Sequence, residues 1–174
     1  ILKYLNEKNP RQSITFKEKI SNNREDVKIK YSDAIWRNTE NIKEGKIIAI
    51  RILNDQGISS SSFKMAEEIF IEIYFKGALI NSNHITIFIY DKFKTLKTVT
   101  GSLQLGLEGV KNNNINLFKA HIKLMLEAGE YSFGFNLGYQ TQKNKGVIMH
   151  EIDEIGPIQI NWDYENDTAP LLVK

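Results

Sequence analysis

Apolar and polar residues alternate along several segments of this chain with the period of two that is typical of half-buried β-strands. The clearest alternation runs from residue 68 to 76, where every second residue is isoleucine or phenylalanine. Residues 84–91 and 131–140 repeat the pattern. One face of these predicted strands is therefore apolar core, and the other face mixes aromatic rings with polar groups.

Shorter or less regular segments add further predicted strands, and turn residues separate them. Asn54-Asp55-Gln56-Gly57 is a strong turn signal, and another turn is predicted at 91–94. Segment 117–125 also contains helix formers, but its alternation and the turn that follows favour a strand, whereas 141–156 is expected to be a polar loop. The additional strands are expected at 46–53, near Phe63, and at 96–100, 103–107, 117–125 and 157–162. About eight short strands with this punctuation predict an all-β, antiparallel β-sandwich.

The first 40 residues lack this alternation, so we predict a polar linker at 1–40 and a β-sandwich domain at 41–174. Residues 1–9 are expected to form one or two helical turns, which Pro10 would end. Trp36 is the exception within the linker, since its large ring is expected to pack onto the edge of the domain. The chain starts at Ile1 rather than methionine, and we therefore expect it to be a piece of a larger protein.

Composition narrows the classes of function. A net charge of +2 is too weak to suggest nucleic acid or an anionic membrane as partner. Cysteine is absent, which excludes disulfides and thiolate metal sites. No apolar run approaches the ~18 residues of a membrane span. At 174 residues the chain has room for one ordinary domain and a tail.

Motifs for catalysis and cofactor binding are missing from the sequence. It contains no G-x-x-x-x-G-K-[ST] or G-x-G-x-x-G loop and no G-x-S-x-G elbow. His84, His121 and His150 are too dispersed to predict a metal site. A glycan-cleaving enzyme would need two carboxylates across a cleft, and Glu72 is the only acid near the middle of a predicted strand. We therefore expect no enzymatic activity, no cofactor and no metal.

The polar faces of the predicted central strands suggest sugar binding instead. Sugars present apolar C–H patches, on which rings can stack, and hydroxyls, which exchange hydrogen bonds with acids, amides and imidazoles. The alternative is a protein-interaction or dimerisation β-sandwich with no glycan ligand, in which a partner covers this face. The candidate carbohydrate-binding residues are Glu72, Tyr74, His84, Thr86, Phe88, Tyr90, Asn136 and Gln140.

Several blocks of the sequence match a known family in their order. They are ILKYLNEKN at 1–9, IIAIRILNDQG at 47–57, FKMAEEIFIEIYFK at 63–76, HITIFIYDKFKT at 84–95 and LMLEAGEYSFGFNLG at 124–138. With these blocks the chain resembles the C-terminal carbohydrate-binding domain of Wzt-type proteins, the nucleotide-binding subunits of ABC exporters of O-antigen and related polysaccharides. It departs from the family at Ala66, where glycine is common, and at Phe93-Lys94, which replaces a turn that usually contains glycine.

The resemblance implies an immunoglobulin-like β-sandwich on the cytoplasmic side of the inner membrane, attached to it through the transporter. Such a domain recognises a completed polysaccharide before export and is not itself catalytic. The implied partners are the polysaccharide, the ATPase domain, the transmembrane subunit and a second copy of the chain. Dimerisation by exchange of the C-terminal strand, here about 157–174, is a further implication. The ligand residues vary within the family, and none is carried over by motif.

Overall fold

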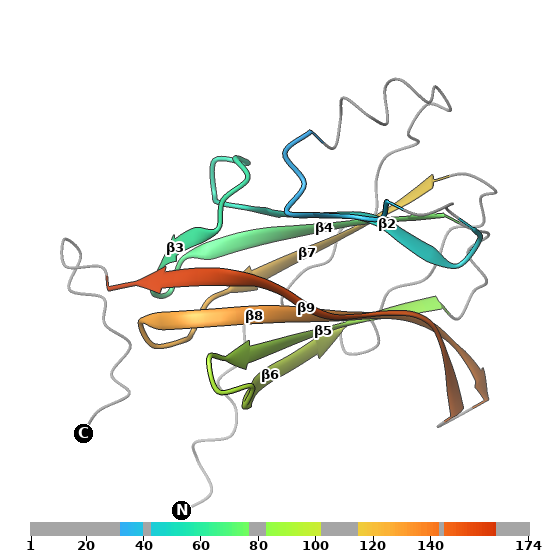
Figure 1. Cartoon of the computed structure of the whole chain (residues 1–174). Coiled ribbons are helices and arrows are strands. Elements are labelled where there is room, and N and C mark those ends of the chain that lie inside the picture. Colours follow the sequence, from blue (N-terminus) through green and yellow to red (C-terminus); the bar gives the residue numbers. More distant parts are fainter. Residues whose placement is uncertain (1–31, 40–42, 77–82, 102–114, 143–144, 163–174) are drawn as a thin grey trace, which may run out of the picture.

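The computed structural model describes residues 32–39, 43–76, 83–101, 115–142 and 145–162. All regular elements in these ranges are β-strands, and they form two sheets that pack face to face (Figure 1). This confirms the prediction of a β-sandwich. The helical turns predicted at 1–9 and the strand predicted at 103–107 lie outside the described residues.

One sheet has four strands in the order β1-β2-β4-β7, and each neighbouring pair is antiparallel. Trp36 begins its first strand and packs against the main core, as predicted. Segment 115–123 is a strand and not a helix. The bounds of these strands are β1 Trp36–Arg37, β2 Lys46–Leu53, β4 Glu68–Lys76 and β7 Ile115–Lys123.

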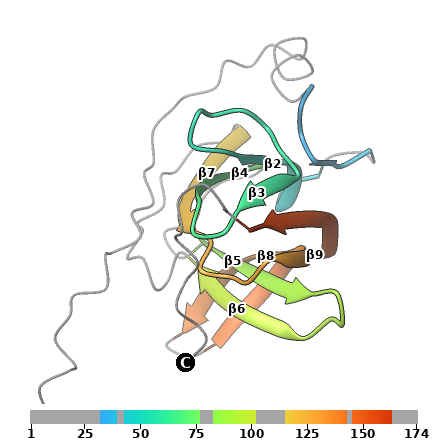
Figure 2. The same ribbon diagram turned by 90° about the vertical axis from the view of Figure 1, so that its left-hand side faces the viewer.

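The second sheet has five strands in the order β3-β9-β8-β5-β6. All its pairs are antiparallel except β3–β9, which is parallel. Figure 2 shows this sheet beneath the four-stranded one, with β6 at its outer edge. The bounds are β3 Ser62–Lys64, β5 Asn83–Asp91, β6 Leu96–Gly101, β8 Gly129–Gln142 and β9 Lys145–Asn161.

The core lies between the two sheets and follows the alternation of the sequence. The inward residues of each strand are buried, and their neighbours point outward, because successive side chains of a strand alternate in direction. The isoleucines of β4 and β5 and two phenylalanines of β8 form the centre of this core. They are Ile69, Ile71, Ile73, Ile85, Ile87, Ile89, Phe133 and Phe135.

The prediction of a polar loop at 141–156 is wrong, because β9 begins at Lys145 and pairs with β8 along most of its length. Its pairing with β8 shifts at several points, and each extra residue in a bulge interrupts the alternation that marks a strand in sequence. Residues 157–161 are the end of this strand and pair with β8 and β3 of the same chain. Residues 157–161 are therefore not an isolated strand, and residues 163–174 of the segment expected to exchange lie outside the described ranges.

The two turns predicted at 54–57 and 91–94 are present, and Ala66 lies in a third. The Asn54 side chain accepts hydrogen bonds from the backbone N–H groups of Gln56 and Ile58 at 3.1 and 2.8 Å, and Gly57 has a φ of 76°. Ala66 and Lys94 also have positive φ, at 60° and 61°. These two residues occupy left-handed positions that favour glycine, at the two places where the sequence departs from the pattern that it resembles.

Candidate functional site

The structure divides the eight candidate residues between opposite sides of the sandwich. Glu72 and Tyr74 lie on β4, in the four-stranded sheet. The other six are His84, Thr86, Phe88, Tyr90, Asn136 and Gln140, which lie on β5 and β8 of the five-stranded sheet. The prediction that all eight share one face is therefore wrong, since β4 and β5 follow one another in sequence but belong to different sheets.

On the four-stranded sheet, Glu72 is the centre of a buried polar network. Its Oε2 atom accepts a hydrogen bond from the Tyr74 hydroxyl at 2.6 Å and lies 2.8 Å from Arg51 Nη1. Its Oε1 atom lies 2.9 Å from Lys119 Nζ. Glu72 and Tyr74 are only 5% and 1% exposed, and their polar side-chain atoms make their contacts within the protein. The network satisfies a buried carboxylate, as such a group requires.

The electrostatics of this network follow from its contacts. Burial alone would raise the pKa of Glu72, but hydrogen bonds from Tyr74 and Lys119 and the charges of Lys119 and Arg51 outweigh it and lower that pKa below its ordinary value. Burial and the hydrogen bond to Glu72 raise the pKa of Tyr74. Glu72 is thus held as a carboxylate and Tyr74 as a neutral phenol, which is the arrangement of a structural pair.

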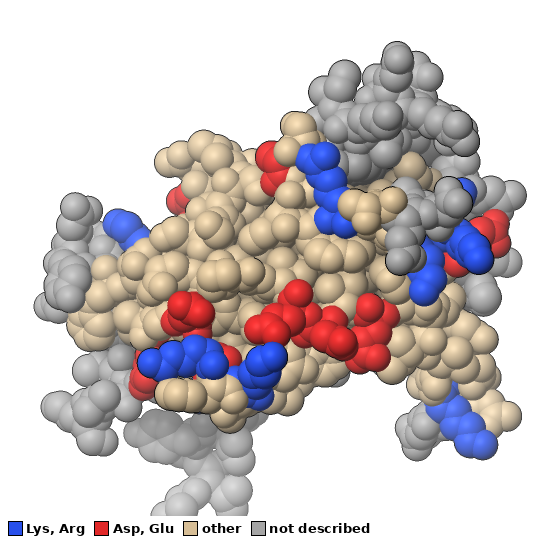
Figure 3. Space-filling view, viewed as in Figure 1, with Lys and Arg blue, Asp and Glu red and all other residues tan. Residues whose placement is uncertain are grey.

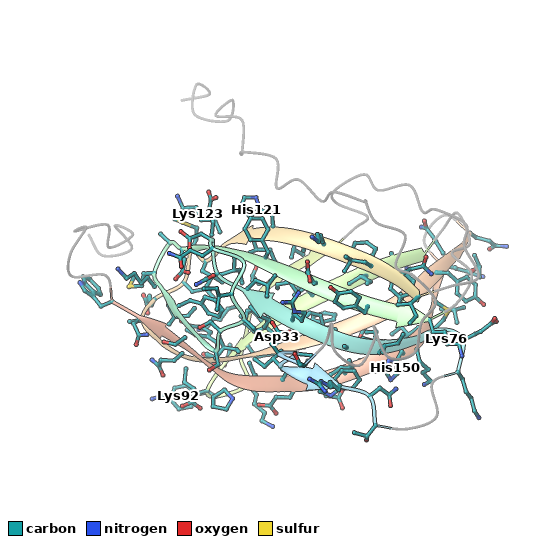
Figure 4. All side chains as sticks on the ribbon, turned by 90° about the horizontal axis from the view of Figure 1, so that it is seen from above. Asp33, Lys76, Lys92, His121, Lys123 and His150 are labelled. Carbon is teal, nitrogen blue, oxygen red and sulfur yellow. The ribbon has the colours of Figure 1, made fainter. Side chains whose placement is uncertain are left out.

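Residues that precede β1 cover part of this face. The Asp33 carboxylate accepts hydrogen bonds from Arg51, and its backbone carbonyl accepts one from the Ser59 hydroxyl at 2.7 Å. Ala34 packs on a small apolar cluster that includes Tyr74. Figure 4 looks onto this side of the molecule and shows Asp33 over the sheet. The outer face of the four-stranded sheet is therefore built largely for internal contacts.

The outer face of the five-stranded sheet keeps the six other candidates together. We define this outer face by the outward residues of β5, β6, β8 and β9, which the strand register sets side by side. All six candidates are half-buried, so each has part of its surface open. From β6 toward β9, the cross-strand rows are Leu96–Tyr90–Ser132, Val99–Phe88–Gly134, Gly101–Thr86–Asn136–Glu151 and His84–Gly138–Ile148, with Gln140 opposite Gly146 beyond them.

Glycines on β8 make room for rings that lie against this sheet. A Cβ atom at Gly134 would come within 3.3 Å of the Tyr90 ring, and one at Gly138 within 3.1 Å of the His84 ring. The Phe88 and Tyr90 rings are stacked, with their centroids 6.2 Å apart and an angle of 19° between the planes. The rings of His84, Phe88 and Tyr90 therefore lie along the sheet beside the two glycines of β8.

Polar groups stand beside the rings. With its side-chain amide in the orientation that matches donors to acceptors, Asn136 donates hydrogen bonds to the Glu151 carboxylate at 3.2 Å and to the Phe135 carbonyl at 3.0 Å. The acids of β9 were missed in the sequence because their segment was assigned to a loop. The signal that could have found them is the spacing of buried Ile152, Ile155 and Ile158 between exposed polar residues.

Two features were compared with the described residues: clusters of metal ligands and helices of membrane-spanning length. No three His, Cys, Asp or Glu side chains of these residues gather where they could hold a metal ion. Within the same residues, no helix has the length and apolar character needed to cross a membrane.

The fold defines the class first: an immunoglobulin-like β-sandwich with one polar-aromatic sheet face. Residues 38–170 match the family model described as "Wzt C-terminal domain", and the chain belongs to this family. A solved structure entitled "Crystal structure of the C-terminal domain of wzt" is similar in fold, with a TM-score of 0.58 and 16% sequence identity over 75% of this chain and 83% of that one. A search against curated proteins gave no match.

Family membership confirms the resemblance found in the sequence. It associates this β-sandwich with polysaccharide exporters of the ABC type. The likeness to the solved structure supports the fold, and the identity of 16% carries no residue of a binding site across.

Proposed function

We propose that this domain binds a polysaccharide through the outer face of its five-stranded sheet, as the non-catalytic, substrate-selecting part of an ABC exporter. The observation that carries the proposal is the row of rings on β5, set beside the amide of Asn136. Phe88 and Tyr90 offer stacked ring surfaces, and Thr86 and Asn136 lie in the neighbouring row. Rings for C–H patches and polar groups for hydroxyls are the two components that sugar recognition needs.

The proposed site omits two of the residues that the sequence suggested and adds one that it did not. Glu72 and Tyr74 are left out, because their polar atoms bind each other and both are buried. Glu151 is added as a positioning group, since it accepts the hydrogen bond that orients the Asn136 amide. His84 and Gln140 stay as candidates at the end of the face nearer the β8–β9 turn.

The family suggests which other parts of an exporter would work with this domain. In the proposed setting the domain follows an ATPase domain on the cytoplasmic side of the inner membrane, and the transmembrane subunit of the exporter is its partner. The ATPase would drive transport, whereas this domain would decide which glycan is transported. We further propose that the domain acts as a homodimer, as the family resemblance implies.

The test is binding of the 174-residue chain to polysaccharide extracted from its source organism, measured by affinity electrophoresis or calorimetry. We expect Tyr90→Ala to weaken binding at least about tenfold, because truncating an anchor ring of an interface costs about 2 kcal/mol or more, and about 1.4 kcal/mol corresponds to tenfold. Phe93→Ala is the matched control. Phe93 is a ring 77% exposed in the β5–β6 turn, and its removal should leave binding unchanged.

Two results would contradict the proposal. Equal binding by the unaltered chain and by Tyr90→Ala would place the glycan elsewhere on the molecule. No binding to any glycan, together with a dimer that protects Tyr90 from solvent, would favour the interaction domain without a glycan ligand.

A further inference from the structure

The charged side chains that β9 contributes to the central rows of the outer face are all acidic. These rows run from Leu96–Tyr90–Ser132 to His84–Gly138–Ile148. The charged residues of β9 in these rows are Glu151, Asp153 and Glu154, all exposed. Lys97, the extra residue of the β6 bulge beside Tyr90, pairs with Asp91 at 3.0 Å, so these two charges cancel. In Figure 3, acidic side chains form a row over the part of the surface where β8 and β9 run.

A bulge in β9 places two of these acidic residues opposite one residue of β8. Phe135 pairs with Ile152 and Phe133 pairs with Ile155, so Gly134 faces two residues, Asp153 and Glu154. The Asp153 carbonyl lies 3.0 Å and the Tyr90 ring 3.3 Å from the position of a Cβ at Gly134. The two acidic residues and the Tyr90 ring therefore neighbour the same glycine, on opposite sides of β8.

Only one of the three carboxylates is neutralised by a cation among the described residues. Lys94 Nζ, from the β5–β6 turn, lies 3.0 Å from Glu154. Neither Glu151 nor Asp153 forms an ion pair within the described ranges. Three acids and one lysine give this part of the face a charge of −2, whereas the whole chain has a net charge of +2. The face is thus acidic on a weakly basic protein.

We propose that these carboxylates make the face selective for glycans without acidic groups, that is, for neutral or amino-substituted sugars. This inference rests on the proposed function, because it assigns a substrate class to the same surface. A glycan with uronate, phosphate or other acidic substituents would bring like charges against Glu151 and Asp153. Like charges at an interface reject a partner without adding affinity for the correct one.

The size of this effect follows from the charge separation. Two unit charges about 5 Å apart in water repel one another enough to reduce affinity roughly fourfold. Two carboxylates would therefore reduce the affinity for an acidic glycan on the order of tenfold at low salt. Because the face is open to solvent, salt near 0.5 M should remove most of the difference, as the Debye length is then only about 4 Å.

The experiment separates envelope polysaccharide of the source organism by anion exchange into an unretained fraction and an acidic, retained fraction. Both fractions are applied to the immobilised 174-residue chain at low salt. A third probe is the unretained glycan oxidised at its primary hydroxyls to uronates, which has the same backbone with added carboxylates. We expect binding of the unretained fraction and at least tenfold weaker binding of its oxidised form.

Variants then assign the discrimination to the β9 acids. Glu151→Gln with Asp153→Asn should raise the ratio of oxidised to unoxidised binding on the order of tenfold. The matched control, Glu44→Gln with Asp55→Asn, removes two exposed carboxylates outside the outer face and should leave the ratio unchanged. Circular dichroism and a melting curve confirm that the variants are folded.

The outcomes separate this inference from the proposed function. Preferential binding of the acidic fraction, lost in Tyr90→Ala, would overturn the charge selectivity while supporting glycan binding on this face. An equal ratio in the β9 variant and its control would overturn the role of Glu151 and Asp153. Binding of neither fraction would overturn both proposals.

Discussion

The guanidinium of Arg51 donates two hydrogen bonds to the carboxylate of Asp33, from Nε to Oδ1 at 2.9 Å and from Nη2 to Oδ2 at 2.6 Å. Its third nitrogen, Nη1, lies 2.8 Å from Glu72. Arg51 thus joins a segment that precedes β1 to a buried carboxylate in the middle of β4. The two halves of this arrangement differ in environment, since the Asp33 side chain is 40% exposed and that of Glu72 is 6% exposed.

That difference in burial predicts that Arg51 is coupled more strongly to Glu72 than to Asp33 in its effect on the free energy of unfolding. Asp33→Asn should lower the free energy of unfolding by less than about 1 kcal/mol, because an exposed ion pair contributes little. Arg51→Met should cost about 2–4 kcal/mol, since it leaves the buried Glu72 with fewer charge partners. Urea unfolding of single and double variants gives the coupling energies. A larger coupling of Arg51 to Asp33 than to Glu72 would contradict this view.

Acid should destabilise the domain through Glu72. The pKa of its carboxyl is lowered by folding, so the unfolded chain takes up a proton at a higher pH than the folded domain does. The stabilisation is therefore complete above the ordinary value of 4.5 and is lost as the pH falls through the folded pKa. Asp33, whose pKa is also lowered, acts in the same direction. We expect the free energy of unfolding to fall below pH 4.5, and to fall less steeply in Glu72→Gln. Parallel profiles for the two proteins would exclude Glu72 as the source.

Local alternation predicted the regular strands, because a flat strand repeats its pattern every two residues. It found β4, β5 and β8, whose buried isoleucines and phenylalanines follow that period. It found the end of β9 at 157–161 but failed in the earlier part of that strand, where bulges against β8 place extra residues between the inward isoleucines. The sandwich could thus be inferred from its regular strands. The irregular pairing of β9, its longest strand, removed the alternation that would have predicted it.

The candidate site shows the same limit in another form. Alternation tells which residues of one strand share a face, and it grouped Phe88 with Tyr90 correctly. It does not tell which strands lie in the same sheet, because pairing joins residues far apart in sequence. Tyr74 was therefore grouped with Tyr90, although the two belong to opposite sheets. Alternation placed Glu72 beside Tyr74 on one face of β4, but the packing of the segment around Ala34 on Tyr74 has no sequence signature.

Replacing Ala66 by glycine should stabilise the domain. Ala66 has a φ of 60°, a conformation that costs a residue with a Cβ atom about 1–2 kcal/mol. Glycine removes this strain but adds about 0.5–1 kcal/mol of entropy to the unfolded chain. The expected gain is about 0.5–1 kcal/mol, measurable by urea unfolding. The reverse substitution at Gly57, where φ is 76° and a Cβ would meet nothing within 4 Å, should cost about 1 kcal/mol and controls for packing effects. A loss of stability in Ala66→Gly would contradict the strain argument.

Gly138→Ala should damage the outer face more than Gly146→Ala, although both glycines lie near His84. A Cβ at 138 would lie 2.6 Å from the Val147 carbonyl oxygen and 3.1 Å from the His84 ring, so the β8–β9 pair would have to separate. At 146 the shortest contact would be 3.5 Å, which is ordinary van der Waals packing. Overpacking of this kind costs about 1–3 kcal/mol. We expect a loss in that range for Gly138→Ala and less than half of it for Gly146→Ala by thermal or urea unfolding. Equal losses would show that the glycines serve backbone conformation rather than the close approach of β9 and the His84 ring.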